Sequence, residues 1–367
     1  MIKKLFYILF IVSALLTLAN FSFFTPTAKN KQNIKILNVK NNSTPVVKIT
    51  SSPKITPTIT LDSIFSSSND LSNYNKNELV TIAATGDFIP ARSVNYQTIK
   101  NNNFLWTIQN VSSYFTKADI VFVNLESPIF KNCPITNQGF VFCGEDKHIN
   151  ALTKINTSVV NLANNHLSNY GENGYLKTKN ILKEANILTT GDQTQIIEKK
   201  GTKFAFLGYN DIGYTPNYLY KADLQKIEND IKQAKKSANV VIVQFHFGAE
   251  YSYYPDTRQV ELAKSAVGFG ADLIIGNHPH YIQPVQIYKN KVIMYAHGNF
   301  VFDQMWSEET KQGVIGYYTF YKNNLVDVKY KPVYIKNYGE GIIPNTYIYE
   351  QILNKLKQIS IQYSQLN

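Results

Sequence analysis

Short runs of branched and aromatic hydrophobic residues recur along the chain and alternate with amphipathic segments. The runs predict buried strands at residues 79–84, 120–123, 158–162, 204–208, 240–245 and 271–275. Hydrophobic residues at helical spacing lie between several of them, at residues 105–115, 172–185, 224–238 and 258–269. Strands that are apolar almost throughout and alternate with helices predict an α/β fold whose sheet is covered on both faces.

Polar residues follow most of these strands at their carboxyl ends. They are carboxylates, amides and imidazoles: Asp87, Asn124, Glu126, Asn165, His166, His246, His278 and His280. In open α/β sheets ligands bind at that edge. The chain has 6 histidines, and most of them occupy these strand ends, which favours a shared site over scattered surface positions. His148 lies outside the series and is expected at the surface.

The densest part of the series is the sequence GNHPH at residues 276–280, directly after the last of these strands. Gly276 and Pro279 favour a tight turn that aims His278 and His280 together. Imidazole is a common metal ligand because it is largely uncharged near neutral pH. By itself the pair fits a structural role as well as a metal site, and the other strand-end residues favour the metal site.

The donor set as a whole mixes oxygen and nitrogen and lacks thiolate. Such a set suits one or two divalent ions of Mn, Fe or Zn. Two ions bridged by a carboxylate would activate water and polarise a phosphoryl or carbonyl oxygen. Each residue also has a structural alternative. Asp87 could cap a helix, Asn124 and Glu126 could form a turn, and His246 could be a hydrogen-bonded core histidine.

The N-terminal residues 1–24 have the pattern of a membrane anchor. Lys3 and Lys4 precede an apolar run at residues 5–24, and a helix of about 20 residues spans the hydrocarbon core. Lysines before the run predict a cytoplasmic N-terminus with the remaining chain outside the cell. A cleaved signal peptide is the alternative, but residues 25–28 are a poor cleavage site. We therefore expect a single-pass protein of the cell membrane with an extracellular domain.

Composition divides the rest of the chain. Residues 25–77 are rich in Ser, Thr, Asn and Pro and predict a flexible linker. Residues 78–340 are expected to form the folded domain, and residues 341–367 a C-terminal helix. The net charge is +11, but nine lysines and three acidic residues lie in residues 1–78. The domain is therefore only mildly basic, which disfavours nucleic acid and allows an anionic polymer as partner.

The sequence has 2 cysteines, Cys133 and Cys143, on either side of a turn-like segment. In an exported protein such a pair predicts a disulfide. A thiolate metal pair is disfavoured, because two sulfurs do not complete a tetrahedral site.

Six sequence segments occur in an order that resembles one known family. They are GDFIPAR (86–92), NLESPI (124–129), NLANNHLSNYG (161–171), HFGAEY (246–251), GADLIIGNHPHYIQP (270–284) and GNFVFD (298–303). The chain thereby resembles the CapA family, proteins of poly-γ-glutamate capsule biosynthesis that are similar to calcineurin-like metallophosphatases. The resemblance implies a four-layer α/β/β/α sandwich of the metallophosphatase type with the site between the strand ends of the inner sheets.

The resemblance also implies roles for individual residues. The implied metal ligands are Asp87, Glu126, Asn165, His246, His278 and His280, with Glu126 as the bridge. Asn165 and His166 would take part in catalysis, His166 as the general acid. Arg92 and Glu250 would contact substrate or orient the metal ligands. His297 stands where the family usually has Leu before GNF, and it could line the substrate site or be an additional ligand. The chain departs from the full metallophosphatase pattern at Asp87, which is not followed by the histidine of an Asp-x-His pair.

Together these features predict a membrane-anchored extracellular metal-dependent hydrolase of phosphoesters or amides. Its expected process is the synthesis, export or processing of an anionic capsular polymer, poly-γ-glutamate. One alternative is a non-catalytic accessory subunit that assembles with a polymer synthase or export complex. Another is a general extracellular phosphodiesterase, which rests on fold analogy.

Overall fold

Two mixed sheets form the centre of the structure. The computed structural model describes residues 58–65 and 70–366. Within these residues the large sheet has the order β14-β13-β12-β1-β2-β3-β4, with β11 also paired to β1, and the small sheet has the order β5-β6-β7-β8-β10-β9. In the large sheet β11, β1, β2, β3 and β4 are parallel, and in the small sheet β6, β7, β8 and β10 are parallel.

The bounds of the strands and helices are as follows. The large sheet contains β1 (Leu79–Phe88), β2 (Ile120–Leu125), β3 (Val159–Asn161), β4 (Leu188–Thr190), β11 (Asn299–Val301), β12 (Gln312–Tyr321), β13 (Asn324–Lys336) and β14 (Glu340–Ile342). The small sheet contains β5 (Gln195–Lys199), β6 (Thr202–Asn210), β7 (Val240–His246), β8 (Leu273–Asn277), β9 (Val285–Tyr288) and β10 (Lys291–Met294). The helices are α1 (Leu61–Phe65), α2 (Ser93–Lys100), α3 (Ile149–Lys154), α4 (Gly171–Glu184), α5 (Leu224–Lys235), α6 (Thr257–Phe269) and α7 (Thr346–Leu366), with short 3-10 helices at Lys76–Glu78, Ser112–Phe115 and Asp146–His148.

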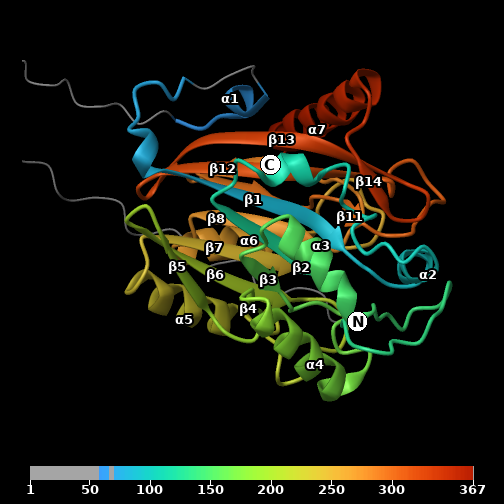
Figure 1. The fold of residues 1–367 in the computed structure, drawn as a ribbon. Coiled ribbons are helices and arrows are strands. Elements are labelled where there is room, and N and C mark those ends of the chain that lie inside the picture. The colour runs from blue at the N-terminus through green and yellow to red at the C-terminus, as the bar shows by residue number, and fades with distance from the viewer. Residues whose placement is uncertain (1–57, 66–69, 367) are drawn as a thin grey trace, which may run out of the picture. The chain divides into compact units, whose positions relative to one another are not determined.

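The two sheets pack face to face through a shared hydrophobic core. Phe122 of β2 meets Phe206 of β6 with ring centroids 5.1 Å apart, and Phe204 meets Phe320 at 5.6 Å. Alternate residues of each strand face this core, and the others face helices. Helices α3 and α4 cover the outer face of the large sheet, while α5 and α6 cover that of the small sheet. The expected α/β class is confirmed, and the layers run helix, sheet, sheet, helix (Figure 1).

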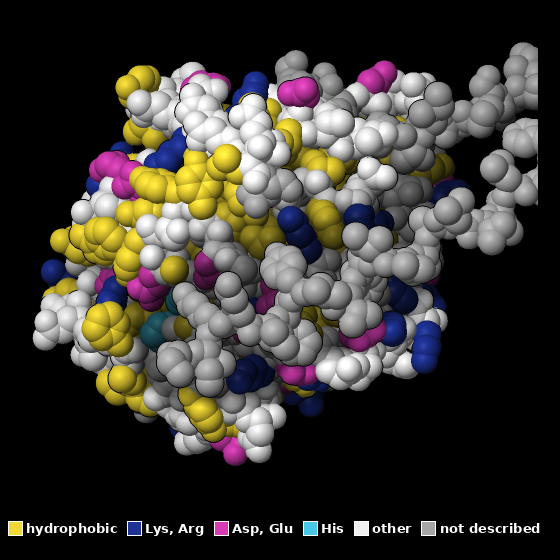
Figure 2. Space-filling view, turned by 180° about the vertical axis from the view of Figure 1, so that it is seen from behind, with side chains coloured by type: hydrophobic (Ala, Val, Ile, Leu, Met, Phe, Trp, Pro, Cys, Tyr) yellow, Lys and Arg dark blue, Asp and Glu magenta, His cyan; other side chains and the backbone are white. Residues whose placement is uncertain are grey.

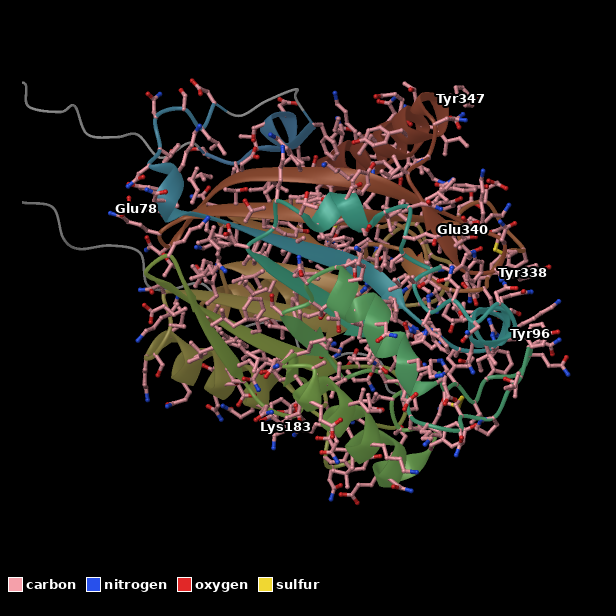
Figure 3. All side chains as sticks on the ribbon, viewed as in Figure 1. Glu78, Tyr96, Lys183, Tyr338, Glu340 and Tyr347 are labelled. Atoms are coloured by element: carbon pink, nitrogen blue, oxygen red, sulfur yellow. A yellow bond between two sulfur atoms is a disulfide. The ribbon has the colours of Figure 1, made fainter. Side chains whose placement is uncertain are left out.

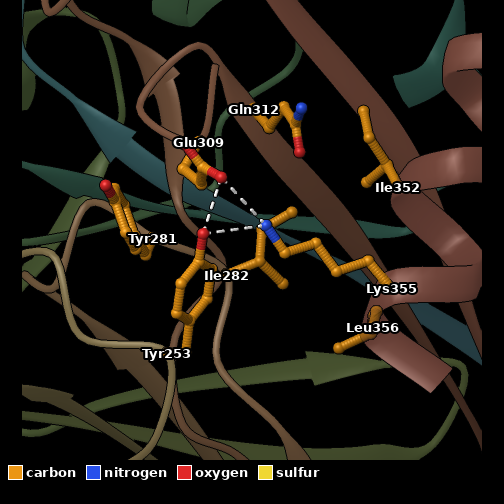
Figure 4. Close-up of a pocket in the computed structure, with 8 residues that line it drawn as sticks. All are labelled: Tyr253, Tyr281, Ile282, Glu309, Gln312, Ile352, Lys355 and Leu356. Carbon is orange, nitrogen blue, oxygen red and sulfur yellow. Dashed lines mark hydrogen bonds and ion pairs between the residues drawn. The ribbon is translucent and has the colours of Figure 1, made fainter. Parts of the chain in front are cut away.

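The C-terminal helix α7 closes one edge of the core between the sheets. It contacts β13 of the large sheet and β9 of the small sheet, and α1 contacts the same two strands. Beside α7, the Tyr253 hydroxyl donates to Glu309 Oε1 at 2.6 Å, and Lys355 Nζ lies 3.3 Å from the same oxygen (Figure 4). These contacts tie α7 to the loops that follow β7 and β11.

One predicted helix is absent and is replaced by turns. Residues 105–115 form successive turns that end in the 3-10 helix Ser112–Phe115. The N–H groups of Ile108 and Val111 donate to carbonyls three residues earlier. Such repeated turns bury Ile108, Val111 and Phe115 on one side, as a helix would. The hydrophobic spacing therefore predicted the buried face correctly and the type of element wrongly.

Most predictions for the N-terminal region concern residues that the structure does not describe. The expected anchor at residues 1–24 lies outside the described residues, as does most of the expected linker. Among the helices that the structure describes, none is long and apolar enough to cross a membrane. Residues 58–65 belong to the range expected as linker, and they include α1, whose Ile64 is buried against the core between the sheets.

The carboxyl ends of the parallel strands lie at one end of the molecule. Glu78 immediately precedes β1, and Tyr96 lies in α2, which follows it. Figure 3 places these two side chains at opposite ends of the view, so β1 runs from the Glu78 end to the Tyr96 end. The strand-end residues predicted from the sequence therefore lie in the same region.

Candidate metal centre

Rows of polar side chains cross both sheets at this end. In the large sheet Asn299, Asp87, Asn124 and Asn161 stand at one level on β11, β1, β2 and β3. In the small sheet His246 of β7 pairs with Asn277 of β8. All of these residues are buried. Because side chains at one level of a parallel sheet point to the same face, the register itself gathers the polar groups.

Asn124 is a positioning residue between two sheets. Its Oδ1 accepts a hydrogen bond from Asn161 Nδ2 at 3.2 Å, and its Nδ2 donates to Asp87 Oδ1 at 2.8 Å. The same Nδ2 lies 3.3 Å from His246 Nδ1. The oxygen that would bind a metal is thus engaged by Asn161, and the amide nitrogen orients an aspartate and a histidine. The structure brings Asn124 to the cluster in this orienting position, which is how residues around metal ligands act.

The turn after β8 holds its two histidines in unusual backbone conformations. His278 has φ 100° and His280 has φ 58°, a region that non-glycine residues rarely adopt. The N–H of His278 donates to Asp87 Oδ2 at 3.2 Å. A Cβ added at Gly276 would lie 1.8 Å from the carbonyl oxygen of Tyr295, so this approach requires glycine. Strained residues of this kind concentrate at functional sites.

Two groups of potential ligands share Glu126. One consists of Glu126, His246 and His278 and the other of Asp87, Glu126 and His280, each with its ligand atoms within 4.8 Å of one another. His246 Nε2 lies 3.4 Å from Glu126 Oε1 and 2.8 Å from the Oδ1 of Asn165. The ligands predicted from the sequence therefore converge from both sheets, and Glu126 is common to both of these groups.

Several of these potential ligand atoms have no hydrogen-bond partner in the described part of the chain, which is the state expected of atoms that bind a cation. Neither carboxylate oxygen of Glu126 has a hydrogen-bond partner among the described residues, and the same holds for Nδ1 of His278. A buried carboxylate without a partner costs free energy that a bound cation would recover. Burial, and next the charge of Asp87, raise the pKa of Glu126 well above its ordinary value. An oxygen and nitrogen set of this composition fits Mn, Fe or Zn.

The remaining protonation states also suit a cation. Burial by itself would raise the pKa of Asp87, but the hydrogen bond and charge of His280 hold it below its ordinary value. Burial lowers the pKa of His246 well below its ordinary value and that of His278 to about 3. Asp87 is thus ionised and both rings are neutral at pH 7, which is the state in which these side chains bind metals.

His166 lies at the border of this cluster, against the disulfide loop. Its ring stacks on Phe142 with centroids 4.0 Å apart, and its Nδ1 is 3.0 Å from Asn169 Oδ1. The N–H of Phe142 donates to the same oxygen at 2.7 Å, so this atom is an acceptor and His166 Nδ1 is the donor. Nε2 is therefore the atom that can exchange a proton. Burial lowers the pKa of His166 to about 4.

Arg92 and Glu250 flank the cluster from different loops. Arg92 pairs with Asp303 and lies between Phe142 and Phe302, with its guanidinium 5.0 and 4.8 Å from the two ring centroids. It also donates to the carbonyl of Gly139 in the disulfide loop at 3.2 Å. Arg92 thus fixes that loop. Glu250 is exposed and forms a third group of potential ligands with His278 and His280.

Comparison with known proteins identifies the family. Residues 81–304 match the family described as bacterial capsule synthesis protein PGA_cap, over more than half of the chain. The chain belongs to this family. It is 30% identical over 272 residues to the capsule biosynthesis protein CapA of Bacillus anthracis, covering 67% of this chain and 65% of that protein. It is 33% identical over 229 residues to the PGA biosynthesis protein CapA of Bacillus subtilis, covering 57% of this chain and 60% of that protein. The chain thus spans less than two thirds of either relative.

Solved structures resemble the chain more distantly than these sequence relatives do. A phosphatase from Mycoplasma pneumoniae aligns with 75% of this chain and 99% of its own, at 13% identity and a TM-score of 0.46. A likeness at this level assigns no function. The assignment to the PGA_cap family therefore rests on sequence.

Two further histidines are buried and make ring contacts outside the set of potential ligands. His297 is fully buried, with Nδ1 3.3 Å from the Gly276 carbonyl and Nε2 3.0 Å from the Tyr318 hydroxyl. Both ring nitrogens are thus engaged by groups outside the set of potential ligands. His148, expected at the surface, is fully buried and lies 3.1 Å from Asn95 Oδ1. Because it follows a polar loop, its burial depends on packing that the sequence pattern does not show.

The sequence pattern missed three asparagines that the structure places around the site. Asn161 and Asn299 extend the row beside Asp87 and Asn124, and Asn169 orients His166. Asn161 closes a predicted strand and could have been found by the same rule as Asn124. Asn299 begins a short strand of three residues, which gives little signal. Figure 2 shows a histidine reaching the surface in a small area beside hydrophobic side chains.

Proposed function

We propose that this protein is a metal-dependent hydrolase of phosphoesters or amides that serves the synthesis, export or processing of an anionic capsular polymer, poly-γ-glutamate. Membership of the PGA_cap family supports the process, since relatives are described as capsule and PGA biosynthesis proteins. The cluster of carboxylates, imidazoles and amides supports the chemistry.

One observation carries the proposal. Glu126 is fully buried, has no hydrogen-bond partner among the described residues, and belongs to two of the three groups of potential ligands. Burial opposes ionisation of such a carboxylate, and a cation bound between it and the neighbouring imidazoles would compensate its charge. We therefore assign Asp87, Glu126 and His280 to one divalent ion, and Glu126, Asn165, His246 and His278 to a second.

The chain's own residues position the reaction. Ions held by these donors supply Lewis acidity toward a phosphoryl or carbonyl centre. Asn124 keeps Asp87 and His246 in place through its amide nitrogen. His166, held by Asn169 through Nδ1, would take up at Nε2 the proton released by the attacking water and pass it to the leaving group. Arg92 holds the disulfide loop, and with it Phe142, against the His166 ring.

The proposed location is the outer surface of the cell membrane. Residues 1–24 would anchor the chain with the domain outside, where capsular polymer or synthase subunits are the partners. The disulfide between Cys133 and Cys143 supports an oxidising compartment.

Metal content and hydrolysis of the purified full-length chain test the proposal. We expect one or two equivalents of Mn, Fe or Zn and hydrolysis of a phosphodiester or of poly-γ-glutamate. Glu126→Gln and His246→Ala should lose both. Glu261→Gln serves as the matched control, because Glu261 is half-exposed, pairs with Arg258 within helix α6, and is not one of the potential ligands.

The possible outcomes separate the alternatives. Less than one equivalent of metal after loading would contradict the hydrolase proposal. Stoichiometric metal without any turnover would favour the accessory subunit. Hydrolysis of simple phosphodiesters without any effect on the polymer would favour a general phosphodiesterase.

A further inference from the structure

Asn299 lies next to Asp87 in a position that the sequence did not single out. The two residues are register partners on the parallel strands β11 and β1. Asn299 is fully buried. Its side chain therefore shares the face and the level of Asp87, beside the proposed ion of Asp87, Glu126 and His280.

The orientation of the Asn299 amide is fixed by its donors. Nδ2 donates to the backbone carbonyl of Thr310 at 2.9 Å and to Gln304 Oε1 at 3.4 Å. A carbonyl oxygen only accepts, so the atom facing Thr310 must be the nitrogen. Gln304 is fixed in turn, because its Nε2 donates to the Tyr251 hydroxyl at 2.9 Å. The remaining atom, Oδ1, is thereby turned toward His280.

The distances around Oδ1 match a shared ion. Asn299 Oδ1 lies 2.9 Å from His280 Nδ1, and that nitrogen lies 3.3 Å from Asp87 Oδ2. Donors bound to one ion at about 2.1 Å and at right angles lie roughly 3 Å apart. We propose that Asn299 is a metal ligand, contributing Oδ1 to the ion held by Asp87, Glu126 and His280.

The donor count supports this assignment, which rests on the metal site of the proposed function. Asp87, Glu126 and His280 supply three side-chain donors, whereas ions of this class take at least about four ligands. A neutral amide oxygen adds a donor without adding charge beside two carboxylates. The competing role is a positioning one, in which Asn299 Oδ1 accepts a hydrogen bond from His280 Nδ1 and does not touch the ion.

Cobalt(II) bound to an Asn299→Cys variant of the full-length chain distinguishes the two roles. A sulfur at this position that reaches the ion gives an intense near-ultraviolet thiolate-to-cobalt absorption band, and a positioning residue gives none. Asn164→Cys is the matched control. Asn164 is also a buried asparagine, but its amide donates to the Leu125 carbonyl and its oxygen accepts from the N–H of Leu167.

We expect the band in Asn299→Cys and its absence in wild type and in Asn164→Cys. Cobalt bound by Asn299→Cys without the band would overturn the assignment. Wild-type protein that binds no cobalt would instead contradict the proposed function, which keeps the two failures apart.

A second variant covers the case in which Asn299→Cys does not fold. Asn299→Asp preserves the side-chain shape and offers a stronger ligand, but it gives up the hydrogen bonds of Nδ2 to Thr310 and Gln304. If residue 299 binds the ion, we expect cobalt affinity to rise at least tenfold by calorimetric titration. Unchanged or weaker affinity would count against ligation.

Discussion

At the scale of single residues, the site contains buried polar groups that have no hydrogen-bond partner among the described residues. Glu126 is fully buried beside Asp87, and neither of its oxygens meets a hydrogen-bond donor among the residues described. A residue selected for stability alone would not be kept in this environment. The cost is consistent with a role in binding a cation.

Replacing Glu126 by Gln should separate stability from metal binding. The substitution removes a carboxyl group whose ionisation is opposed by burial and by Asp87, so we expect metal-free protein to gain roughly 1–3 kcal/mol in unfolding free energy near pH 7. Metal affinity should fall by at least about tenfold, as seen when groups around a metal are removed. Urea denaturation in chelator and calorimetric titration measure the two effects. A less stable metal-free variant would contradict this interpretation of Glu126.

His148 predicts a pH dependence away from the metal donors. Burial lowers its pKa to about 3 from the ordinary value of 6.5. Between these values the unfolded chain binds a proton that the folded protein excludes, so stability falls as pH falls below about 6.5, by about 1.4 kcal/mol per pH unit for this proton.

The variant His148→Gln tests this prediction, because glutamine keeps an amide donor for Asn95 and does not titrate. We expect the unfolding free energy of the metal-free variant to fall less steeply between pH 6.5 and pH 5, as measured by urea denaturation. The slope should decrease by the amount that corresponds to about one bound proton. An unchanged slope would mean that His148 is not the residue concerned.

At the scale of elements, the disulfide loop forms a wall of the site. Cys133 and Cys143 are joined, which confirms the expected disulfide. The loop that they close carries Phe142 onto the His166 ring and offers its Gly139 carbonyl to Arg92. Covalent closure thus restrains the segment that supports His166.

Replacing both cysteines by Ser should lower the unfolding free energy by roughly 2–3 kcal/mol, because closure of a short loop restricts the unfolded chain. We also expect any hydrolytic activity to decrease as Phe142 loses its fixed position beside His166. Thermal unfolding with and without reductant provides the internal control. Reductant should destabilise wild type and leave the double variant unchanged, and an equal effect on both would argue against the disulfide as the cause.

At the scale of the whole molecule, stability depends on closing the core between the two sheets. Helix α7 contacts β13 and β9, one strand from each sheet, and buries Ile352, Leu356 and Ile359 in the shared core. The Ser360 hydroxyl also accepts a hydrogen bond from the N–H of Val285 at 2.9 Å. The last helix in the sequence therefore joins both halves of the fold.

Leu356→Ala tests this closure. Leu356 is 1% exposed, so its truncation leaves a cavity and should cost about 2–4 kcal/mol in unfolding free energy. Leu366→Ala in the same helix is the control, because Leu366 is 79% exposed and should change stability by less than about 0.5 kcal/mol. Denaturant unfolding compares the two variants, and similar values would show that α7 does not contribute to the core.

The sequence predicted the strands and the strand-end donors because both are local properties. Continuous Val, Ile and Phe runs can be buried on two faces, as in β2 and β7. The hydrophobic pattern predicted the wrong type of element at residues 105–115, because successive turns bury the same positions that a helix would. It also failed at His148, whose burial depends on packing against Asn95, a residue distant in the chain.

The amino-acid sequence by itself determined which residue types stand at the carboxyl ends of the strands, since hydrophobic periodicity fixes where each strand ends. Only the tertiary structure decided which of them meet. The register of β11, β1 and β2 brings Asn299 and Asn124 to the two sides of Asp87, and the packing of the second sheet brings His246 across to Glu126. Strand register and sheet packing arise from contacts between distant segments, and they place Glu126 where, among the described residues, it is buried without a hydrogen-bond partner.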